Sequence, residues 1–195
     1  RPNGYIGFRY ELTPYLKYGH EKNVLAVKVD NSQQPNSRWY SGSGIYRNVW
    51  LITTNDVFVD HWGTYITTPE VSDKKATVVL QASLHNNRNI IVKTTIYNAA
   101  NAVVQTQQAT VSGNKTTQQF TIANPHLWSV NDPYLYKART QLVSNGKIID
   151  EYTTSFGIRY FNFDVEKGFF LNGKHVKIRG VCNHHDLGCL GTAIN

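Results

Sequence analysis

YLYKARTQLVSNGKIIDEY, residues 134–152, is the stretch that decides the fold. Two runs rich in strand-forming residues, 134–142 and 148–152, flank the pair Asn145-Gly146. An Asn-Gly pair readily adopts the positive φ angles that a two-residue hairpin turn requires. We therefore expect two antiparallel strands joined at this pair.

Similar strand-like runs precede this hairpin. They cover residues 57–60, 76–84, 90–97, 103–111 and 117–122. The runs at 103–111 and 117–122 are polar, as edge strands often are, and Trp62-Gly63 is expected to end the short run at 57–60. Short strands separated by turn signals at roughly 8–12-residue spacing are typical of an immunoglobulin-like β-sandwich. We expect one such domain, of about a hundred residues.

The N-terminal part of the chain also alternates apolar and polar residues. The alternation covers residues 5–12, 23–30 and 45–52. A period of two is the pattern of a half-buried strand, so three further strands are expected here. Thr13 followed by Pro14 reads as a helix N-cap with a first-turn proline, which predicts one helical turn over residues 15–17.

The C-terminal part predicts a hairpin followed by one more strand. Phe161 and Phe163 alternate into a turn at residues 166–168, and Asn172-Gly173 is a second turn signal. Residues 176–181 then alternate again, so we expect a strand that ends where polar residues begin.

A cluster of polar, reactive side chains follows this last strand. It comprises Cys182, Asn183, His184, His185 and Asp186. Such residues at the C-terminal end of a strand suit the active face of a barrel enzyme, and they also suit a solvated loop. A metal site would use these residues with Cys189. However, neighbours such as His184 and His185 point to opposite faces of an extended chain, and no second ligand cluster follows, so we expect no metal.

Arg38 is a candidate binding residue at the end of a polar loop. Its guanidinium is a rigid fork of donors that suits hydroxyl or carboxylate partners. A structural salt bridge and a ligand contact both fit this position, and the two interpretations stay open. The neighbouring Trp39 and Tyr40 favour ordinary aromatic packing.

Composition excludes several classes of protein. Of the 195 residues 41% are hydrophobic, 12% aromatic and 17% charged, which supplies a core and argues against disorder. No apolar run is long enough to span a membrane. The net charge is +7, but Lys and Arg are spread along the chain without a nucleic-acid-binding motif. We expect neither membrane nor nucleic acid as a partner.

Four motifs in a fixed order carry a resemblance to a known family. They are Arg38-Trp39-Tyr40 with Gly42, Gly44, Ile45, Tyr46 and Arg47; Leu127-Trp128 with Pro133, Leu135 and Tyr136; Phe156-Gly157-Ile158-Arg159; and Leu171-Asn172-Gly173 leading to Gly180-Val181 and His184. Together they resemble the glycoside hydrolase family 2 enzymes, the β-galactosidase, β-glucuronidase and β-mannosidase group. The resemblance covers nearly the whole chain.

The resemblance implies a mainly β, three-part architecture. Residues 1–54 would be the C-terminal part of a jelly-roll sugar-binding domain, 55–160 an immunoglobulin-like β-sandwich, and 161–195 the leading hairpin and first strand of a TIM barrel. A jelly roll has about eight strands and a barrel about 250 residues. We therefore expect that the chain represents part of a longer polypeptide.

The resemblance also implies a retaining glycosidase mechanism. Such enzymes use two carboxyl groups about 5–5.5 Å apart, one as nucleophile and one as acid/base. In the family both are glutamates on later barrel strands, which would lie beyond Asn195. The glutamates present are Glu11, Glu21, Glu70, Glu151 and Glu166, all in expected strands or turns. We expect no catalytic residue in this chain, no cofactor, and no hydrolase activity of the chain alone.

The family places sugar contacts on residues that this chain does contain. His184 matches the histidine that contacts sugar hydroxyls at the end of the first barrel strand, and Arg38 falls on a loop that reaches the barrel mouth. Asn183 and Asp186 either contact the sugar or orient His184, whereas His185 is expected to point away. The chain has Cys182-Asn183 where the best-known members have Asn-Arg, which leaves open which neighbour touches the sugar.

A β-galactoside is the expected substrate, and the rest of the parent polypeptide the expected partner. β-Glucuronides and β-mannosides stay open, as do homo-oligomerisation and cellular location. The main rival hypothesis is a non-catalytic carbohydrate-binding or adhesion module. It would use Trp39, Tyr40, Trp50 and Trp62 as a sugar-stacking platform, which requires exposed and coplanar rings.

Overall fold

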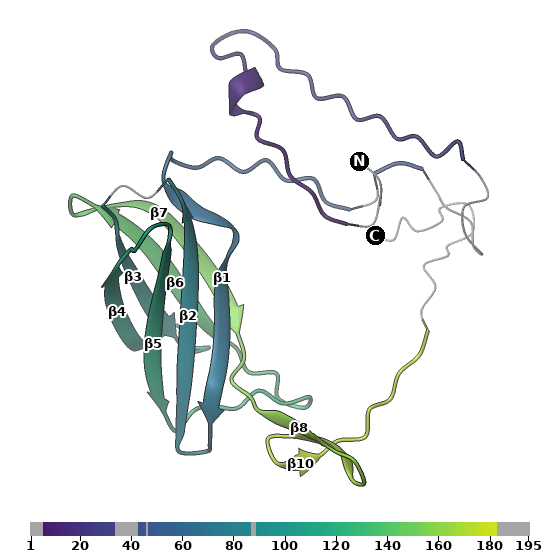
Figure 1. Cartoon of the computed structure of the whole chain (residues 1–195), viewed down its shortest axis with the longest axis vertical. Coiled ribbons are helices and arrows are strands. Elements are labelled where there is room, and N and C mark those ends of the chain that lie inside the picture. The colour runs from purple at the N-terminus through teal and green to yellow at the C-terminus, as the bar shows by residue number, and fades with distance from the viewer. Residues whose placement is uncertain (1–5, 34–42, 46, 87–88, 183–195) are drawn as a thin grey trace. The chain divides into compact units, whose positions relative to one another are not determined.

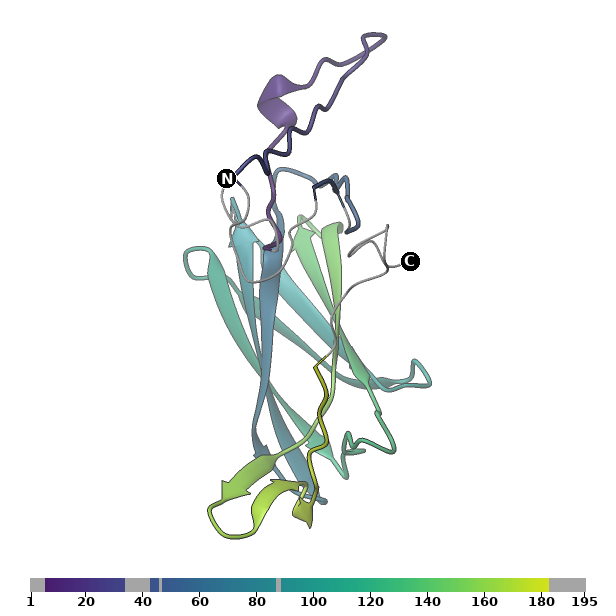
Figure 2. The ribbon, with the colours of Figure 1, turned by 90° about the vertical axis from the view of Figure 1, so that its right-hand side faces the viewer.

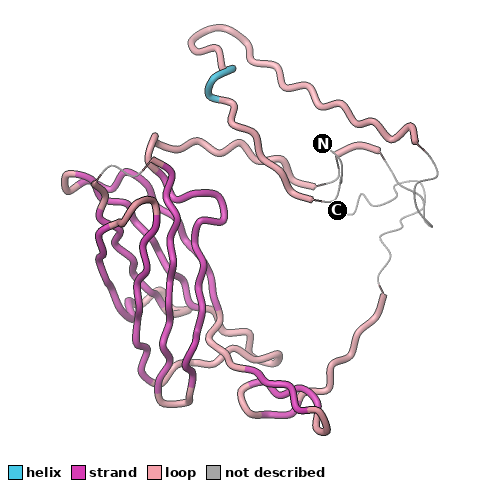
Figure 3. The backbone as a smooth tube through the Cα atoms, in the orientation of Figure 1, coloured by secondary structure: helices cyan, strands magenta, loops and turns pink. Residues whose placement is uncertain are grey.

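The computed structural model describes residues 6–33, 43–45, 47–86 and 89–182 of the chain (Figure 1). The chain divides into two compact units. One is Trp50–Val181, and the other combines Arg1–Val49 with Cys182–Asn195. Strands dominate the first unit, as the colouring by secondary structure shows (Figure 3).

Seven of the described strands form a sandwich of two antiparallel sheets (Figures 1 and 2). They are β1 (Phe58–Val71), β2 (Lys75–His85), β3 (Ile91–Tyr97), β4 (Val103–Thr110), β5 (Lys115–Ala123), β6 (Tyr136–Ser144) and β7 (Lys147–Phe156). One sheet has the order β1-β2-β5 and the other the order β4-β3-β6-β7. This is the immunoglobulin-like arrangement that the sequence predicted, with the polar strands β4 and β5 at sheet edges.

The hairpin that opened the sequence analysis is confirmed. Ser144 pairs with Lys147, so Asn145 and Gly146 form a two-residue turn between β6 and β7. Their φ angles are 49° and 74°, the positive values that favour Asn and Gly in this kind of turn.

Alternate side chains of both sheets fill the space between them. On β5, Thr116, Gln118, Phe120 and Ile122 point inward and are buried, while the residues between them are exposed. The main core cluster joins Phe120 and Leu80 of one sheet to Ile96 and Ala138 of the other. The period-two pattern read from the sequence therefore marks the core face correctly.

The prediction that Trp62-Gly63 ends the first strand is wrong, because β1 continues through this pair as a bulge. The register shifts there, from Val59 opposite Leu84 to Thr64 opposite Ala82. Trp62 has a φ of 53°, and a Cβ on Gly63 would lie 2.6 Å from the Asp60 carbonyl oxygen. A glycine inside a strand often marks such a bulge, which re-aims the neighbouring side chain.

The three strands predicted in the N-terminal part are not formed in the described residues. Residues 6–12, 23–30 and 47–52 have no strand pairing, and their apolar side chains face solvent, with Val24 89% exposed. A strand exists through hydrogen bonds to a neighbour, and alternation alone does not supply that neighbour.

The predicted helical turn is present but begins earlier in the chain. It is the 3₁₀ helix η1 (Thr13–Tyr15), with Pro14 in its first turn and Leu12 as N-cap. The Thr13 N-cap is therefore wrong, because its hydroxyl donates to the Glu11 carboxylate instead of capping the helix. No helix among the described residues is long and apolar enough to cross a membrane.

After the sandwich the chain forms a small separate sheet of β8 (Phe161–Asp164), β9 (Gly168–Leu171) and β10 (Lys174–His175). The hairpin of β8 and β9 and the turn after it were predicted, whereas the short strand β10 was not. The strand predicted over residues 176–181 is not formed. Val176 still donates its N–H to the Phe169 carbonyl at 2.9 Å, but the following described residues have no strand partner. A barrel strand pairs with neighbours on both sides, and the described chain offers none here.

Candidate functional site

The four predicted sugar-binding residues, Arg38, Asn183, His184 and Asp186, lie outside the described residues. The last described residue before Asn183, His184 and Asp186 is Cys182, which has a free and exposed thiol. What the structure shows is how the segment that leads to this cluster is anchored. That segment is the β8–β10 hairpin, and its anchor is a seam with the sandwich.

The seam consists of Leu127, Trp128, Gly157, Ile158, Tyr160 and Asn172. Leu127 and Ile158 form an isolated parallel bridge, and Trp128 donates its N–H to the Ile158 carbonyl at 2.8 Å. This bond ties the connection between β5 and β6 to the chain that leaves β7. The segment that leads from β7 to the hairpin is therefore hydrogen-bonded to the β5–β6 connection of the sandwich.

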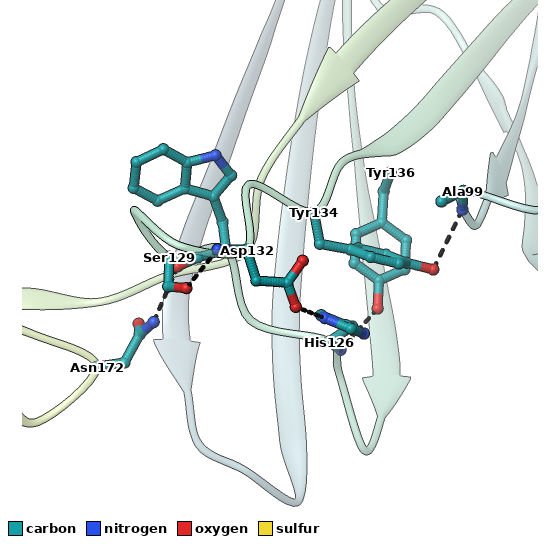
Figure 4. Close-up of polar contacts among 8 residues, drawn as sticks. Ala99, His126, Ser129, Asp132, Tyr134, Tyr136 and Asn172 are labelled. Atoms are coloured by element: carbon teal, nitrogen blue, oxygen red, sulfur yellow. Dashed lines mark hydrogen bonds and ion pairs between the residues drawn. The ribbon is translucent and has the colours of Figure 1, made fainter.

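Asn172, in the turn between β9 and β10, contacts both the β5–β6 connection at Trp128 and the segment after β7 at Tyr160. Its side-chain Nδ2 donates to the Trp128 carbonyl at 2.9 Å (Figure 4). Its Oδ1 accepts from the Tyr160 N–H at 3.1 Å. Its own N–H donates to the Tyr160 carbonyl at 2.9 Å. One amide side chain thus uses both its donor and its acceptor to connect segments far apart in the sequence.

Trp128 fills the seam, and its indole leaves no room for a larger neighbour. A Cβ on Gly157 would lie 2.9 Å from the Trp128 Cβ and 3.0 Å from its Cγ. The Arg159 Cζ lies 5.2 Å from the indole centroid, within the range of a cation–π contact. Glycine is therefore required at position 157 for a steric reason.

We expect Gly157→Ala to destabilise the Trp50–Val181 unit by about 1–3 kcal/mol, because overpacking forces the indole or the backbone to move. Urea unfolding followed by circular dichroism measures this change. Gly180→Ala is the matched control, since nothing lies within 4 Å of a Cβ there. Equal urea midpoints for the two variants would show that the Trp128 side chain can move aside without loss of stability.

A polar and aromatic network holds the β5–β6 connection in place (Figure 4). The His126 Nε2 lies 2.5 Å from the Asp132 Oδ2, and the imidazole stacks on Tyr134 with centroids 3.9 Å apart. The His126 N–H donates to the Tyr136 hydroxyl at 2.9 Å, and the Tyr134 hydroxyl accepts from the Ala99 N–H at 3.2 Å. Burial raises the pKa of the Tyr136 phenol above its ordinary value, so at neutral pH the phenol stays uncharged. These contacts hold His126 and Asp132, which lie on either side of Trp128 in this connection.

A sequence model of glycosyl hydrolases family 2 matches residues 57–159, more than half of the chain. This range coincides with the sandwich and ends inside the seam. The chain belongs to glycosyl hydrolases family 2.

Relatives within this family match the chain over its whole length. A β-galactosidase of Bacteroides ovatus, BoGH2A, is 50% identical and covers 100% of this chain, which spans 24% of that enzyme. A putative β-glucuronidase of Formosa agariphila is 38% identical over 99% of this chain and 19% of its own length. The crystal structure of a β-glycosidase from Bacteroides vulgatus superposes with a TM-score of 0.87 at 34% identity, covering all of this chain and 25% of its own. The chain thus spans about a quarter or less of these relatives.

Three of the four family 2 motifs meet at the seam. The Leu127-Trp128 motif, the Gly157-Ile158-Arg159 motif and the Asn172-Gly173 motif supply its hydrogen bonds and its packing. Sequence analysis marked Asn172-Gly173 as a turn and did not identify the seam. The order of these motifs along the chain indicated the family, but the sequence does not show that the motifs contact one another.

Four of the five glutamates of this family 2 chain make local structural contacts. Glu11 accepts from Thr13, Glu21 pairs with Lys17, Glu70 accepts from Thr77, and Glu151 contacts Gln141 and Arg139. A hollow along β4 and β5 has no carboxylate in its lining, and one at the β1–β2 turn has Glu70 alone. Neither hollow offers the pair of carboxyl groups that retaining hydrolysis needs. No group of three or more potential metal ligands occurs among the described residues.

Two tryptophans of the proposed stacking platform are exposed. Trp50 is 76% and Trp62 77% exposed, whereas Trp39 and Tyr40 lie outside the described residues. The Trp62 indole stacks on the His61 imidazole, with centroids 4.7 Å apart and planes 25° from parallel. Exposure satisfies one requirement of the platform, and the ring beside Trp62 is a histidine.

Proposed function

We propose that this chain is the scaffold and part of the sugar-binding site of a retaining β-galactosidase whose catalytic glutamates lie elsewhere in the enzyme. The observation that carries the proposal is the 50% identity to a β-galactosidase across 100% of the chain. An average identity of this level over an alignment that covers the whole chain supports a shared role for the segment.

The proposal assigns the chain to parts of three domains. Residues 1–54 belong to a jelly-roll sugar-binding domain, 55–160 form the sandwich, and 161–195 begin a TIM barrel. The exposed, alternating apolar side chains at residues 6–12 and 23–30 support the first assignment, because such faces suit strands of a larger sheet. The family match over 57–159 supports the second assignment.

The proposed contribution to chemistry is recognition of the sugar. His184 and Arg38 would donate hydrogen bonds to galactose hydroxyls, with Asn183 and Asp186 contacting the sugar or orienting His184. Such bonds lower the barrier when they strengthen as the ring flattens toward the oxocarbenium-like transition state. The two glutamates that attack and protonate would come from outside this chain.

β-Glucuronidase activity is the second candidate. The 38% identity to a putative β-glucuronidase over 99% of the chain favours it. The two substrates differ at C6, where a glucuronide carries a carboxylate and a galactoside a hydroxymethyl group, and in the configuration at C4. A direct comparison of the two glycosides therefore separates the candidates.

A chimera tests the proposal. In it, residues 1–195 replace the matching segment of the Bacteroides ovatus β-galactosidase. We expect the chimera to hydrolyse nitrophenyl β-galactoside within about tenfold of the parent kcat/KM, because tenfold corresponds to only about 1.4 kcal/mol of transition-state energy. We expect the isolated chain to show no turnover, since it lacks the pair of catalytic carboxyl groups. Both are measured by release of nitrophenol.

Three results would contradict the proposal. Turnover by the isolated chain that is lost in Glu151→Gln would place catalysis inside it. A chimera that hydrolyses β-glucuronide faster than β-galactoside would favour the second candidate. Retention of the isolated chain by a polysaccharide matrix, lost in Trp62→Ala, would support the binding-module hypothesis.

A further inference from the structure

Two turns of this chain have the same sequence and the same backbone. Asn145-Gly146 joins β6 to β7 with φ angles of 49° and 74°, and Asn172-Gly173 joins β9 to β10 with 51° and 74°. In each case the flanking residues pair directly, Ser144 with Lys147 and Leu171 with Lys174. The backbone therefore makes the same demand on both asparagines, and glycine would also meet it.

The side chains of the two asparagines differ in their surroundings. Asn145 is exposed, and in the described part of the chain its side chain has no hydrogen-bond partner. Asn172 is half-buried, and its side chain binds the Trp128 carbonyl at 2.9 Å and the Tyr160 N–H at 3.1 Å. The bonds of Asn172 are not a requirement of the turn, so they serve another purpose.

Apolar burial does little to hold the hairpin on the sandwich. Phe161 is 59% and Phe163 70% exposed, and with Phe169 they pack mainly on one another. Leu171, 6% exposed, is the one buried apolar side chain among the described residues of β8 to β10. With so little apolar area removed from water, the orientation of the hairpin depends on directional hydrogen bonds.

We propose that Asn172 is a positioning residue: its side chain forms a clamp, with bonds to Tyr160 at the start of the β8–β10 hairpin and to Trp128 beside the sandwich, and thereby sets the direction in which the chain leaves the hairpin toward the proposed sugar contact His184. The inference rests on the proposed function. Cys182, the last described residue before the cluster, lies ten positions after Asn172. A change in the direction of the hairpin would move the start of that segment with it.

The first test uses the isolated chain and its paired turns. Hydrogen–deuterium exchange is compared for Asn172→Gly and Asn145→Gly. Both variants keep a residue that tolerates positive φ, so only the side chain is lost. We expect Asn172→Gly to raise exchange of the amides of residues 169–176 about tenfold while the strands of the sandwich keep their protection. Asn145→Gly should leave both regions unchanged. Equal exchange of the hairpin in the two variants would overturn the clamp.

The second test places the same two substitutions in the chimera. We expect Asn172→Gly to raise KM for nitrophenyl β-galactoside about tenfold, because a misplaced sugar contact weakens binding of the substrate. Asn145→Gly should leave KM within about twofold of the unsubstituted chimera. A merely structural defect would reduce the amount of active enzyme and lower the apparent kcat at constant KM. Unchanged KM in Asn172→Gly would therefore overturn the positioning role.

The two tests separate failure of the inference from failure of the proposed function. An unsubstituted chimera that does not cleave the β-galactoside would count against the proposed function. The exchange comparison would then decide the clamp by itself, since it needs no substrate. Asn172→Asp adds a control for the chemistry of the clamp. It keeps an acceptor for Tyr160, but it turns a carboxylate toward the Trp128 carbonyl, so we expect it to resemble Asn172→Gly.

Discussion

Replacing Phe120 by alanine is expected to destabilise the sandwich by about 3–5 kcal/mol, the cost of truncating a fully buried phenylalanine. Phe120 is 0% exposed and lies on β5, opposite Val78 of β2 in the same sheet. It belongs to the cluster that also contains Ile96 and Ala138 of the other sheet, so its ring occupies the space between the sheets. Its removal leaves a cavity that two hydrogen-bonded sheets cannot easily close.

An effect of this size is a large fraction of the roughly 5–15 kcal/mol that stabilises a typical domain. Urea unfolding followed by circular dichroism should show a lower midpoint with an unchanged slope. Thr117→Ala is the matched control, because Thr117 is an exposed residue on the same strand and a surface change there costs within about 0.5 kcal/mol. A loss below about 1 kcal/mol in Phe120→Ala would show that the sheets collapse around the missing ring.

The sandwich could be predicted from the sequence because the pattern that marks each strand lies within the strand itself and the turns beside it. The clearest of them have a period-two pattern that matches one buried face, as in Thr116, Gln118, Phe120 and Ile122 of β5 and in Ala76, Val78, Leu80 and Ala82 of β2. The pair Asn145-Gly146 by itself predicts a two-residue hairpin turn. Information of this kind is contained in a few neighbouring residues, so it can be read without the fold.

The failures have the opposite origin, because they depend on partners distant in the sequence. Residues 23–30 alternate as a strand does, yet pairing requires a second strand that the pattern cannot specify. Trp62-Gly63 reads as a strand end because a glycine beside a bulky residue is a turn signal. Only the shifted pairing with β2 reveals it as a bulge.

The seam shows the same limit for the candidate site. Sequence analysis identified Asn172-Gly173 as a turn, but its side-chain bonds reach Tyr160 and Trp128, 12 and 44 positions away. Neither spacing is a feature of any local pattern. The order of the motifs indicated the family, whereas the contacts between them required the three-dimensional structure.

In the chimera, His184→Ala is expected to lower kcat/KM for nitrophenyl β-galactoside by about 10²-fold. The expectation rests on the proposed contact between the imidazole and a sugar hydroxyl. A donor that strengthens its bond in the transition state is worth about that factor when it is removed. Because the bond is made to the bound sugar and strengthens in the transition state, KM should rise and kcat should also fall. Steady-state kinetics with the purified chimera measures both constants.

His185→Ala is the matched control for this prediction, because it deletes the same imidazole from the next position. Adjacent residues of an extended chain face opposite ways, so one of the two side chains can reach the sugar while the other points away. We expect His185→Ala to stay within about threefold of the unsubstituted chimera, since threefold is less than 1 kcal/mol. Equal losses in the two variants would indicate a general disturbance of the segment, and a larger loss in His185→Ala would exchange their roles.

A series of deoxygalactosides then identifies the atom that His184 contacts. For the unsubstituted chimera, removing the contacted hydroxyl should cost about as much as removing the imidazole. For His184→Ala the same removal should cost little more, because the bond is already lost. Non-additivity of this kind is the signature of two groups that interact directly, and it vanishes for hydroxyls that touch other residues. The hydroxyl that shows it would also bear on substrate choice, because galactose and glucose differ in the configuration at C4.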